Sequence, residues 1–458
     1  MTTRHSNPSI VRTASLRTDA PADYLSNALD VALTQIAPVE SRGRVVDAVG
    51  TLIKASGLSA RIGDLCELRD PGSGWRMQAE VVGVARQATL LMPFGDLEGI
   101  GAQTEVAHLG HPQTVCVGDA LLGRVIDGFG EPIDGRGALD TVLRYPVRAA
   151  APDPLTRSRI VRPLQTGVRA IDGLLACGAG QRVGIFAPAG AGKSSLMTMI
   201  SAGTAADVTV VGLIGERGRE VGEFLHGAAQ VERHGRTVYV VATSDRPAVE
   251  RAKAANVATA IAEYFRDQGR SVLLLVDSVT RYARALREIG LAAGEPPARR
   301  GYPPSVFGAL PRLFERAGCS NRGSITAFYT VLVDDDEGGD PIGEEVRALL
   351  DGHIMLSGKL AAAQHYPAID VLASRSRVMS SVASEEQRTL AAEMCSLLAR
   401  YDAIEMLVQI GEYQSGSDAR ADKALRCREA MISFLKQDHA GTSSLRDTLS
   451  RLRSVVNG

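Results

Sequence analysis

The sequence predicts an α/β protein in which a small β-barrel is followed by a mostly parallel, helix-covered sheet and then by a helical C-terminal part. Three observations support this prediction. Residues 39–105 consist of short β-branched runs separated by Gly and Asp, which is typical of an antiparallel barrel. Beyond Pro152, apolar runs alternate with helical patterns, as in a parallel sheet. From about residue 381 onward the pattern is helical throughout.

The expected strands and domain boundaries follow from these changes of pattern. Strands of the sheet are predicted in the runs TVVGLIG, TVYVVATS, SVLLLVD and SITAFYTVLV. Residues 118–135 are rich in Gly, Asp and Pro and are expected to form a connector. We therefore divide the chain into an N-terminal segment, a barrel domain, a central α/β domain and a helical domain, which cover residues 1–38, 39–105, 106–380 and 381–458.

The N-terminal segment combines a polar stretch with a short apolar stripe. Residues 1 to about 20 are rich in Ser, Thr, Arg and Pro and are expected to be disordered. In residues 22–36, leucines recur every four positions, at Leu25, Leu29 and Leu33. This spacing predicts an amphipathic helix ended by Pro38. Its apolar face either packs on the chain's own domain or docks on a partner.

Composition limits the class of protein. The chain has 458 residues, 45% of them hydrophobic and 22% charged, enough for a large core in two or three domains. A net charge of −1 argues against a protein dominated by binding to phosphate backbones, so nucleic acid is not an expected partner. Six scattered cysteines predict neither a zinc site nor a disulfide framework. Without a membrane span or signal core, a soluble cytosolic protein is expected.

The run GIFAPAGAGKSSL, residues 184–196, is the most specific motif in the chain. Four apolar or small residues lead into a phosphate-binding loop, and an apolar helix follows at once, which is the context this motif requires. The loop's glycines let backbone N–H groups surround phosphates, Lys193 supplies a positive charge and Ser194 can ligate Mg²⁺. The common first glycine is Ala187 here, so this position is not expected to need a positive φ. We assign nucleotide binding to Ala189, Gly190, Ala191, Gly192, Lys193, Ser194 and Ser195.

Two acidic positions at strand ends are candidates for the chemistry. Asp277 ends the apolar run LLLVD and can hold a water of the Mg²⁺ shell, although many strands end in an Asp that only caps a turn. Glu216 follows TVVGLIG and can polarise an attacking water, while the adjacent Arg217 can contact phosphate oxygens. The alternative for this pair is a solvated, charged start of a helix.

With these motifs, the chain resembles a known family, the cytosolic ATPases of type III protein secretion systems. These ATPases are relatives of the catalytic subunits of rotary ATP synthases. The resemblance runs from about residue 40 to the C-terminus and is specific in stretches such as PLQTGVRAIDGLLACGAGQRVGIFAPAGAGKSSL, GERGREVGEF and YPAIDVLASRSRVM. It implies an N-terminal β-barrel, a RecA-like P-loop ATPase core and a C-terminal helical domain, with ATP as substrate and Mg²⁺ as cofactor.

The resemblance also implies roles for single residues. Lys193 and Ser194 match the phosphate-loop lysine and the magnesium ligand, Glu216 the glutamate that activates water, Arg217 a phosphate-contacting arginine and Asp277 the acidic residue at the magnesium. Arg377 matches the arginine finger, and Tyr366 the aromatic that stacks on adenine. Two positions depart from the family: Arg375 stands where relatives usually carry an apolar or small residue, and Gly358 replaces a usual arginine.

Because one chain carries both the glutamate and the finger, copies of it can complete one another's sites in a homo-oligomeric ring, for which the resemblance implies a hexamer. The resemblance further implies a stator-like regulator, a central stalk protein and chaperone–substrate complexes as partners. It places the protein in the cytoplasm at the inner membrane, with peripheral membrane association as an option. A host-directed injection system is favoured over a flagellar one.

Three other kinds of protein are alternatives. A noncatalytic rotary ATPase subunit typically has glutamine at the position of Glu216, and a proton-translocating ATP synthase catalytic subunit would lack the finger. A ring-shaped RNA translocase would need a basic, aromatic-studded platform. The first 105 residues hold only Trp75, Tyr24 and Phe94 as Trp, Tyr and Phe, which is few for that purpose.

Overall fold

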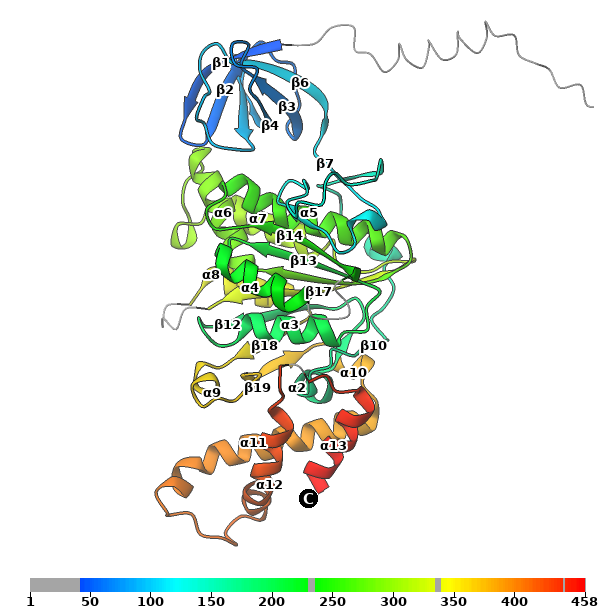
Figure 1. Cartoon of the computed structure of the whole chain (residues 1–458). Helices are drawn as coiled ribbons and strands as arrows, with labels where there is room; N and C mark the ends of the chain where they lie inside the picture. The colour runs from blue at the N-terminus through cyan, green and yellow to red at the C-terminus, as the bar shows by residue number, and fades with distance from the viewer. Residues whose placement is uncertain (1–41, 230–234, 334–338, 440, 458) are drawn as a thin grey trace, which may run out of the picture.

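The computed structural model describes residues 42–229, 235–333, 339–439 and 441–457. The amphipathic helix predicted at residues 22–36 therefore lies outside the described residues. The remaining parts are arranged in a row, with the barrel at one end, the large sheet in the middle and a group of helices at the other end (Figure 1). The order of these parts along the molecule is the order of the predicted domains.

The first part is a closed, six-stranded antiparallel barrel. Alternate residues of its strands point inward, and the buried set includes Ile53, Leu68, Val81 and Leu91. The sixth strand ends at Pro112, beyond the boundary predicted at residue 105, because the run EVAHLGHP lacks a clear apolar alternation. In barrel order the strands are β1 (Arg42–Val49), β2 (Leu52–Ser56), β5 (Thr89–Pro93), β4 (Arg76–Val84), β3 (Asp64–Arg69) and β6 (Glu105–Pro112).

The central sheet has nine strands and is mostly parallel. This confirms the predicted sheet and the four strands read from the apolar runs. In order across the sheet the strands are β19 (Ile369–Ser376), β18 (Gly352–Leu356), β12 (Arg182–Ala187), β17 (Ser324–Leu332), β15 (Ser271–Asp277), β13 (Val208–Ile214), β14 (Thr237–Ala242) and β8 (Val125–Asp127). The short β16 (Gly318–Cys319) pairs antiparallel with β17, and β19 is antiparallel to β18.

The connector predicted at residues 118–135 contributes to the sheet as well. Its three-residue strand β8 pairs in parallel with β14 and forms the edge of the sheet. A strand of three residues between glycines is too short for a periodic signal, so the sequence pattern did not reveal it. Two small two-stranded sheets, β7 (Thr114–Cys116) with β9 (Arg144–Pro146) and β10 (Pro163–Leu164) with β11 (Cys177–Gly178), flank this region.

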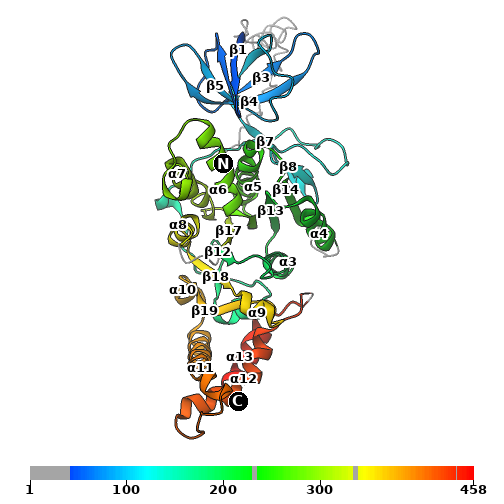
Figure 2. The same ribbon diagram turned by 90° about the vertical axis from the view of Figure 1, so that its left-hand side faces the viewer.

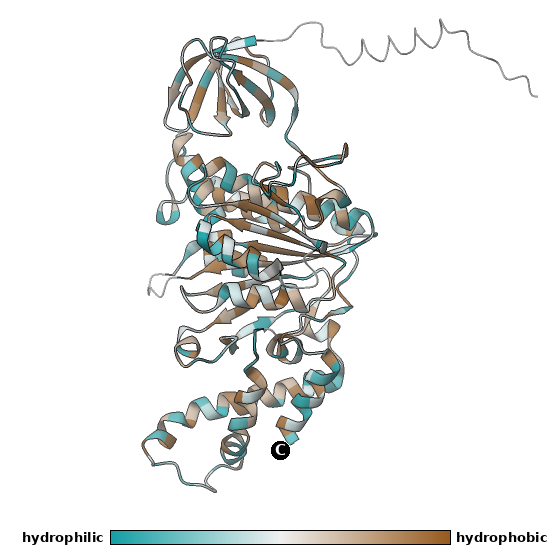
Figure 3. Cartoon of the chain, in the orientation of Figure 1, coloured by the Kyte–Doolittle hydropathy of each residue, from teal (hydrophilic) through white to brown (hydrophobic). Residues whose placement is uncertain are grey.

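Helices cover both faces of the sheet (Figure 2). Alternate strand residues enter two separate cores: Val210, for example, packs in one and Val211 in the other. Since both faces are buried, the strands are apolar along their whole length, as their colour in Figure 3 shows. One face packs on α5 (Ala248–Asp267), α6 (Val279–Ala292), α7 (Pro304–Phe314) and α8 (Pro341–Leu349), and the other on α2 (Arg169–Leu174), α3 (Lys193–Gly203) and α4 (Gly218–Ala229).

The C-terminal part is helical, as predicted. It contains α11 (Glu385–Gln409), α12 (Ala419–Leu435) and α13 (Leu445–Asn457), with the short α9 (Gly358–Ala362) and α10 (Met379–Val382) before them. Gln437, just after α12, ties this part to the central domain. Its side chain accepts a hydrogen bond from the Arg169 backbone N–H and donates one to the Gly167 carbonyl, at 2.9 and 2.7 Å. Among the described helices, none is both long and apolar enough to cross a membrane.

Candidate active site

The phosphate-binding loop connects the end of β12 to the start of α3. Ala187 is the last residue of β12 and is fully buried, and it is not among the described non-glycine residues with positive φ, as expected. Gly190 and Gly192 have φ of 79° and 83°, a left-handed conformation that a residue with a side chain rarely adopts. These two turns bend the loop so that α3 begins directly at Lys193. The amino end of α3 therefore points into the loop, where it favours an anion.

Lys193 lies between the two predicted carboxylates. Its Nζ is 2.5 Å from Asp277 Oδ1 and 3.1 Å from Glu216 Oε1. All three side chains are largely buried, with exposed fractions of 12% for Lys193, 8% for Glu216 and 3% for Asp277. The three residues come from α3 and from the ends of β13 and β15, which are neighbours in the sheet. Residues 84 positions apart in the sequence are thus brought into direct contact.

Two further side chains that the sequence did not single out complete this cluster. Arg281, in the first turn of α6, contacts Glu216 Oε2 at 3.0 Å and donates a hydrogen bond to the Gly215 carbonyl. Thr330 of β17 donates a hydrogen bond of 2.6 Å to Asp277 Oδ1. Both therefore hold a carboxylate in place. Only its position four residues after Asp277, at the end of the run LLLVDSVTR, could have drawn attention to Arg281.

The charges of the cluster shift the acidity of its members. Burial, together with the negative charge of Asp277, raises the pKa of Glu216 to about 7, against the opposing charges of Lys193 and Arg281. Burial by itself would lower the pKa of Lys193, but Asp277 and Glu216 outweigh it and raise that pKa. Glu216 is therefore a carboxyl that exchanges its proton near neutral pH, as a general base requires.

Arg217 lies apart from this cluster in the structure. Its side chain is 77% exposed and forms an ion pair of 2.9 Å with Glu220, one turn further along. Contact between Arg217 and a phosphate remains a prediction from the sequence. In the arrangement seen here, Arg281 is the arginine that touches Glu216.

Tyr366 lies against the loop. A Cβ added to Gly192 would be 3.2 Å from the Tyr366 ring, so this glycine also makes room for the aromatic side chain. The backbone carbonyl of Tyr366 accepts a hydrogen bond of 2.9 Å from the N–H of Gln437. Gly358, the other departure from the family, is close by: a Cβ placed on it would be 3.8 Å from Pro188 of the loop. A ring at this place is well situated to contact a nucleotide held by the loop.

Arg377 lies beside the amino end of β12, whereas the phosphate-binding loop follows the carboxyl end of the same strand. Its N–H donates to the carbonyl of Asp351, whose own N–H donates to Arg182, the first residue of β12. The loop follows Ala187, the last residue of β12, and a strand rises about 3.3 Å per residue, so the two ends are about 17 Å apart. The Arg377 guanidinium donates to the Arg347 carbonyl at 3.2 Å and is exposed, as is Arg375. Neither arginine reaches Lys193 of its own chain.

The residues at the loop fit a nucleoside triphosphate with Mg²⁺. A Cβ on Gly190 would meet nothing within 4 Å, so the loop borders open space in which phosphates can lie. Ser194 is exposed in the first turn of α3, and Asp277 presents a carboxylate nearby. A hydroxyl and a carboxylate are hard oxygen donors of the kind that Mg²⁺ prefers. When a nucleotide binds, the Lys193 ammonium can pair with a phosphate in place of the two carboxylates.

Comparison with known proteins agrees with this geometry. Residues 167–376 match the model of the ATP synthase alpha/beta family, nucleotide-binding domain, and residues 383–454 match that of the T3SS EscN ATPase C-terminal domain. A type 3 secretion system ATPase of Xanthomonas euvesicatoria is 54% identical over 438 residues, which are 96% of this chain and 99% of the relative.

Two further proteins extend the comparison. A flagellum-specific ATP synthase of Treponema pallidum is 48% identical over 94% of this chain and 96% of its own length. The assembled ATPase EscN of the enteropathogenic E. coli type III secretion system, solved in complex with its central stalk EscO, has a TM-score of 0.84 and 49% identity. That similarity covers 90% of this chain and all of the EscN chain.

Proposed function

Since the chain belongs to the type III secretion system ATPases, within the ATP synthase alpha/beta family, we propose that it hydrolyses ATP at sites shared between neighbouring copies of itself. This hydrolysis energises type III protein secretion. The observation that most supports a shared site is the position of Arg377. It lies beside the amino end of β12, whereas Lys193 follows the carboxyl end of that strand. An arginine finger placed there serves the loop of an adjacent copy.

In the proposed reaction, the residues of the loop bind and neutralise the phosphates. Backbone N–H groups of residues 189–195 and the Lys193 ammonium contact phosphate oxygens, while Tyr366 contacts the base. Mg²⁺, when bound by Ser194 and Asp277, supplies positive charge to the phosphate oxygens. Thr330 keeps the Asp277 carboxylate oriented.

Glu216 orients the attacking water and accepts its proton, and Arg281 fixes the direction of that carboxylate. Arg377 of the adjacent copy, together with Lys193, stabilises the charge that develops on the transferred phosphoryl group. Arg217, exposed beside Glu220, is free to turn toward the phosphates when a nucleotide binds.

A shared site predicts that turnover depends on protein concentration. We expect the specific ATPase activity, measured as phosphate released per copy, to rise steeply as the protein is concentrated, because a dilute copy lacks a finger. Sedimentation at the same concentrations should show assembly over the same range. Full turnover by a species that sediments as a monomer would refute the shared site.

The pKa of Glu216 predicts how turnover varies with pH. The carboxylate form is the base, and in the free enzyme it forms as the pH rises through about 7. We therefore expect kcat/KM for ATP to increase with pH, with a midpoint near 7, and to level off at higher pH. In Glu216→Gln the residual activity should not show this acidic limb. An identical limb in that variant would assign the titration to another group.

The assembly and the location of the protein are proposed from its similarity to the relatives. EscN is solved assembled and with its stalk EscO, and we propose that this chain likewise forms a closed, six-membered ring around a central stalk protein. A stator-like regulator and chaperone–substrate complexes are further proposed partners, at the cytoplasmic face of the inner membrane. Phosphate release that is stimulated by export chaperones and not by RNA would support this assignment, and the reverse would refute it.

We propose that the chain serves a host-directed injection system, since the 54% identical Xanthomonas euvesicatoria relative is a type 3 secretion system ATPase. The Treponema pallidum relative keeps flagellar export as the second candidate. The two assignments differ in a measurable way. Deleting the gene should abolish secretion of effector proteins and leave motility intact if the injection assignment is right.

A further inference from the structure

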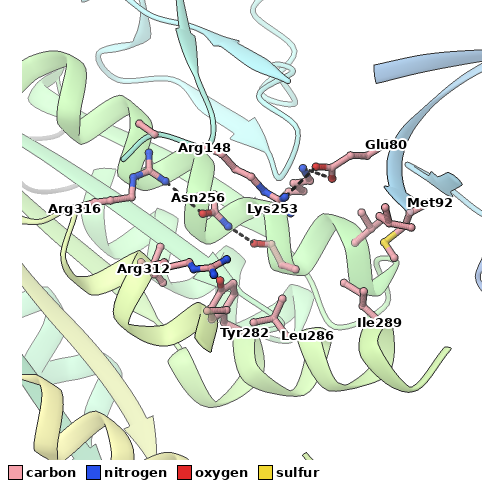
Figure 4. A pocket seen from close by; sticks show the side chains of 16 residues that line it. Glu80, Met92, Arg148, Lys253, Asn256, Tyr282, Leu286, Ile289, Arg312 and Arg316 are labelled. Atoms are coloured by element: carbon pink, nitrogen blue, oxygen red, sulfur yellow. Dashed lines mark hydrogen bonds and ion pairs between the residues drawn. The ribbon is translucent and has the colours of Figure 1, made fainter. Parts of the chain in front are cut away.

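A second cavity lies between the barrel and the central domain, away from the phosphate-binding loop (Figure 4). Its volume is about 400 Å³, within the range of sites that bind small organic molecules. The barrel contributes side chains of β4 and β5, and the central domain contributes α5, α6 and α7. None of the residues that line it belongs to the proposed ATPase machinery.

The walls combine an apolar surface with an excess of positive charge. Met92, Leu286, Ile289 and Leu313 supply apolar side chains. Four cationic side chains also line the cavity, and Figure 4 shows them on more than one wall: Arg148, Lys253, Arg312 and Arg316. An amphiphilic lining of this kind suits a small molecule with an anionic head and an apolar body.

Only part of this positive charge is balanced within the protein. Arg316 is paired with Glu263 at 2.6 Å, and both side chains are 2% exposed. The buried Lys253 Nζ is 2.5 Å from Glu80 Oε2, while Arg148 is 3.4 Å from the other oxygen of the same carboxylate. One carboxylate therefore serves two cations.

Arg312 has no ion pair with any residue in the described part of the chain. The cavity therefore keeps an excess of positive charge at Arg148 and Arg312. These two arginines line the cavity and are exposed, whereas Lys253 is buried. A dianion that enters can accept hydrogen bonds from both guanidinium groups without displacing Glu80 from Lys253.

We infer that this inter-domain cavity binds a small phosphomonoester, with its phosphate between Arg148 and Arg312 and its apolar body against Met92, Leu286 and Ile289. Arginine forks match the geometry of a phosphate dianion. The site is separate from the loop and takes a ligand without a triphosphate. It is the barrel, through Glu80 and Met92, that closes one side of it.

Phenyl phosphate is a suitable probe, measured by titration calorimetry on the full chain with saturating ADP and Mg²⁺ to block the loop. We expect binding with a Kd of about 1 mM or tighter. Arg148→Gln and Arg312→Gln should each weaken it about tenfold, because each removes a charge-assisted hydrogen bond. Ala309→Phe, which fills the cavity, should abolish it. Arg388→Gln, an exposed arginine on α11, is the matched control and should change nothing.

Any one of four outcomes would contradict the inference. The first is no measurable heat with phenyl phosphate, either with or without ADP. The second is heat that appears only when ADP is left out of the titration, because the probe would then occupy the phosphate-binding loop. The third is binding that Arg148→Gln, Arg312→Gln and Ala309→Phe leave unchanged. Phenol, which lacks the phosphate, should bind more weakly than phenyl phosphate; equal binding would also contradict the proposed role of the arginines. Circular dichroism of each variant checks that it is folded.

Discussion

Replacing Arg377 with alanine is expected to lower the rate of ATP turnover about a thousandfold or more, while ATP binding is nearly preserved. The reason is that the finger interacts with charge that develops only in the transition state. Arg377 also lies at the edge of the sheet remote from its own loop, so its loss leaves that loop intact. Single-turnover hydrolysis and the binding of a fluorescent ATP analogue measure the two effects separately.

Arg375→Ala is the matched control for this prediction. Arg375 lies two residues earlier on β19 and is also exposed. We expect this variant to retain most of its turnover. If Arg375→Ala lost turnover and Arg377→Ala kept it, Arg375 would be the finger in this chain.

Mixing two inactive variants tests whether Arg377 acts on a neighbouring copy. Lys193→Ala has no functional loop but an intact finger, and Arg377→Ala has the reverse. In randomly mixed rings, about a quarter of the interfaces join an intact loop to an intact finger. We therefore expect activity to return after mixing two preparations that are each inactive, reaching about a quarter of the original if the sites of a ring act independently and less if each site depends on its neighbour. A mixture that stays inactive, with exchange of copies shown independently, would mean that the finger acts within one chain.

Replacing Glu216 with glutamine is expected to lower kcat by about 10²- to 10⁴-fold. The amide keeps the shape of the side chain but cannot accept a proton from water. ATP affinity should be preserved or should rise, because Lys193 loses one of the two carboxylates that hold it in the free protein. Burst kinetics and equilibrium binding of ATP give the two quantities.

Glu220→Gln is the control for the loss of a neighbouring carboxylate. Glu220 pairs with the exposed Arg217 and stands one turn from Glu216 on α4. This variant should change kcat by severalfold at most. An equal loss in both variants would show that the negative charge of this region, and not the base at position 216, determines turnover.

Much of the fold could be predicted because its determinants are local in the sequence. The strands β13, β14, β15 and β17 are continuous apolar runs, since both faces of each strand are covered, and such runs stand out without any knowledge of the contacts. The phosphate-binding loop is equally local, because glycines, lysine and serine must follow one another on the same turn. Glu216 and Asp277 are predicted at the ends of strands, and in the structure Lys193 contacts both.

What the sequence did not reveal depends on distant contacts. Thr330 touches Asp277 only because β17 lies beside β15, and nothing in a threonine on an apolar strand indicates that contact. Arg281 is one of three arginines in α6, and only the fold selects it as the neighbour of Glu216. The inter-domain cavity joins residues of the barrel and of three helices that are up to 233 positions apart, from Glu80 to Leu313, so no motif describes it.

The strand β12 connects the two parts of the chain that serve neighbouring active sites in the proposed ring. Its carboxyl end continues into the loop that holds a nucleotide, and its amino end, through Arg182 and Asp351, is hydrogen-bonded to the backbone of Arg377. In the proposed ring, one short, buried strand thus connects the nucleotide site of each copy to the arginine that enters the site of the next copy. A shift of the loop on hydrolysis would be transmitted along that strand to the next site. Hydrolysis at one site would then determine when the neighbouring site becomes active, so that turnover would pass around the ring in one direction.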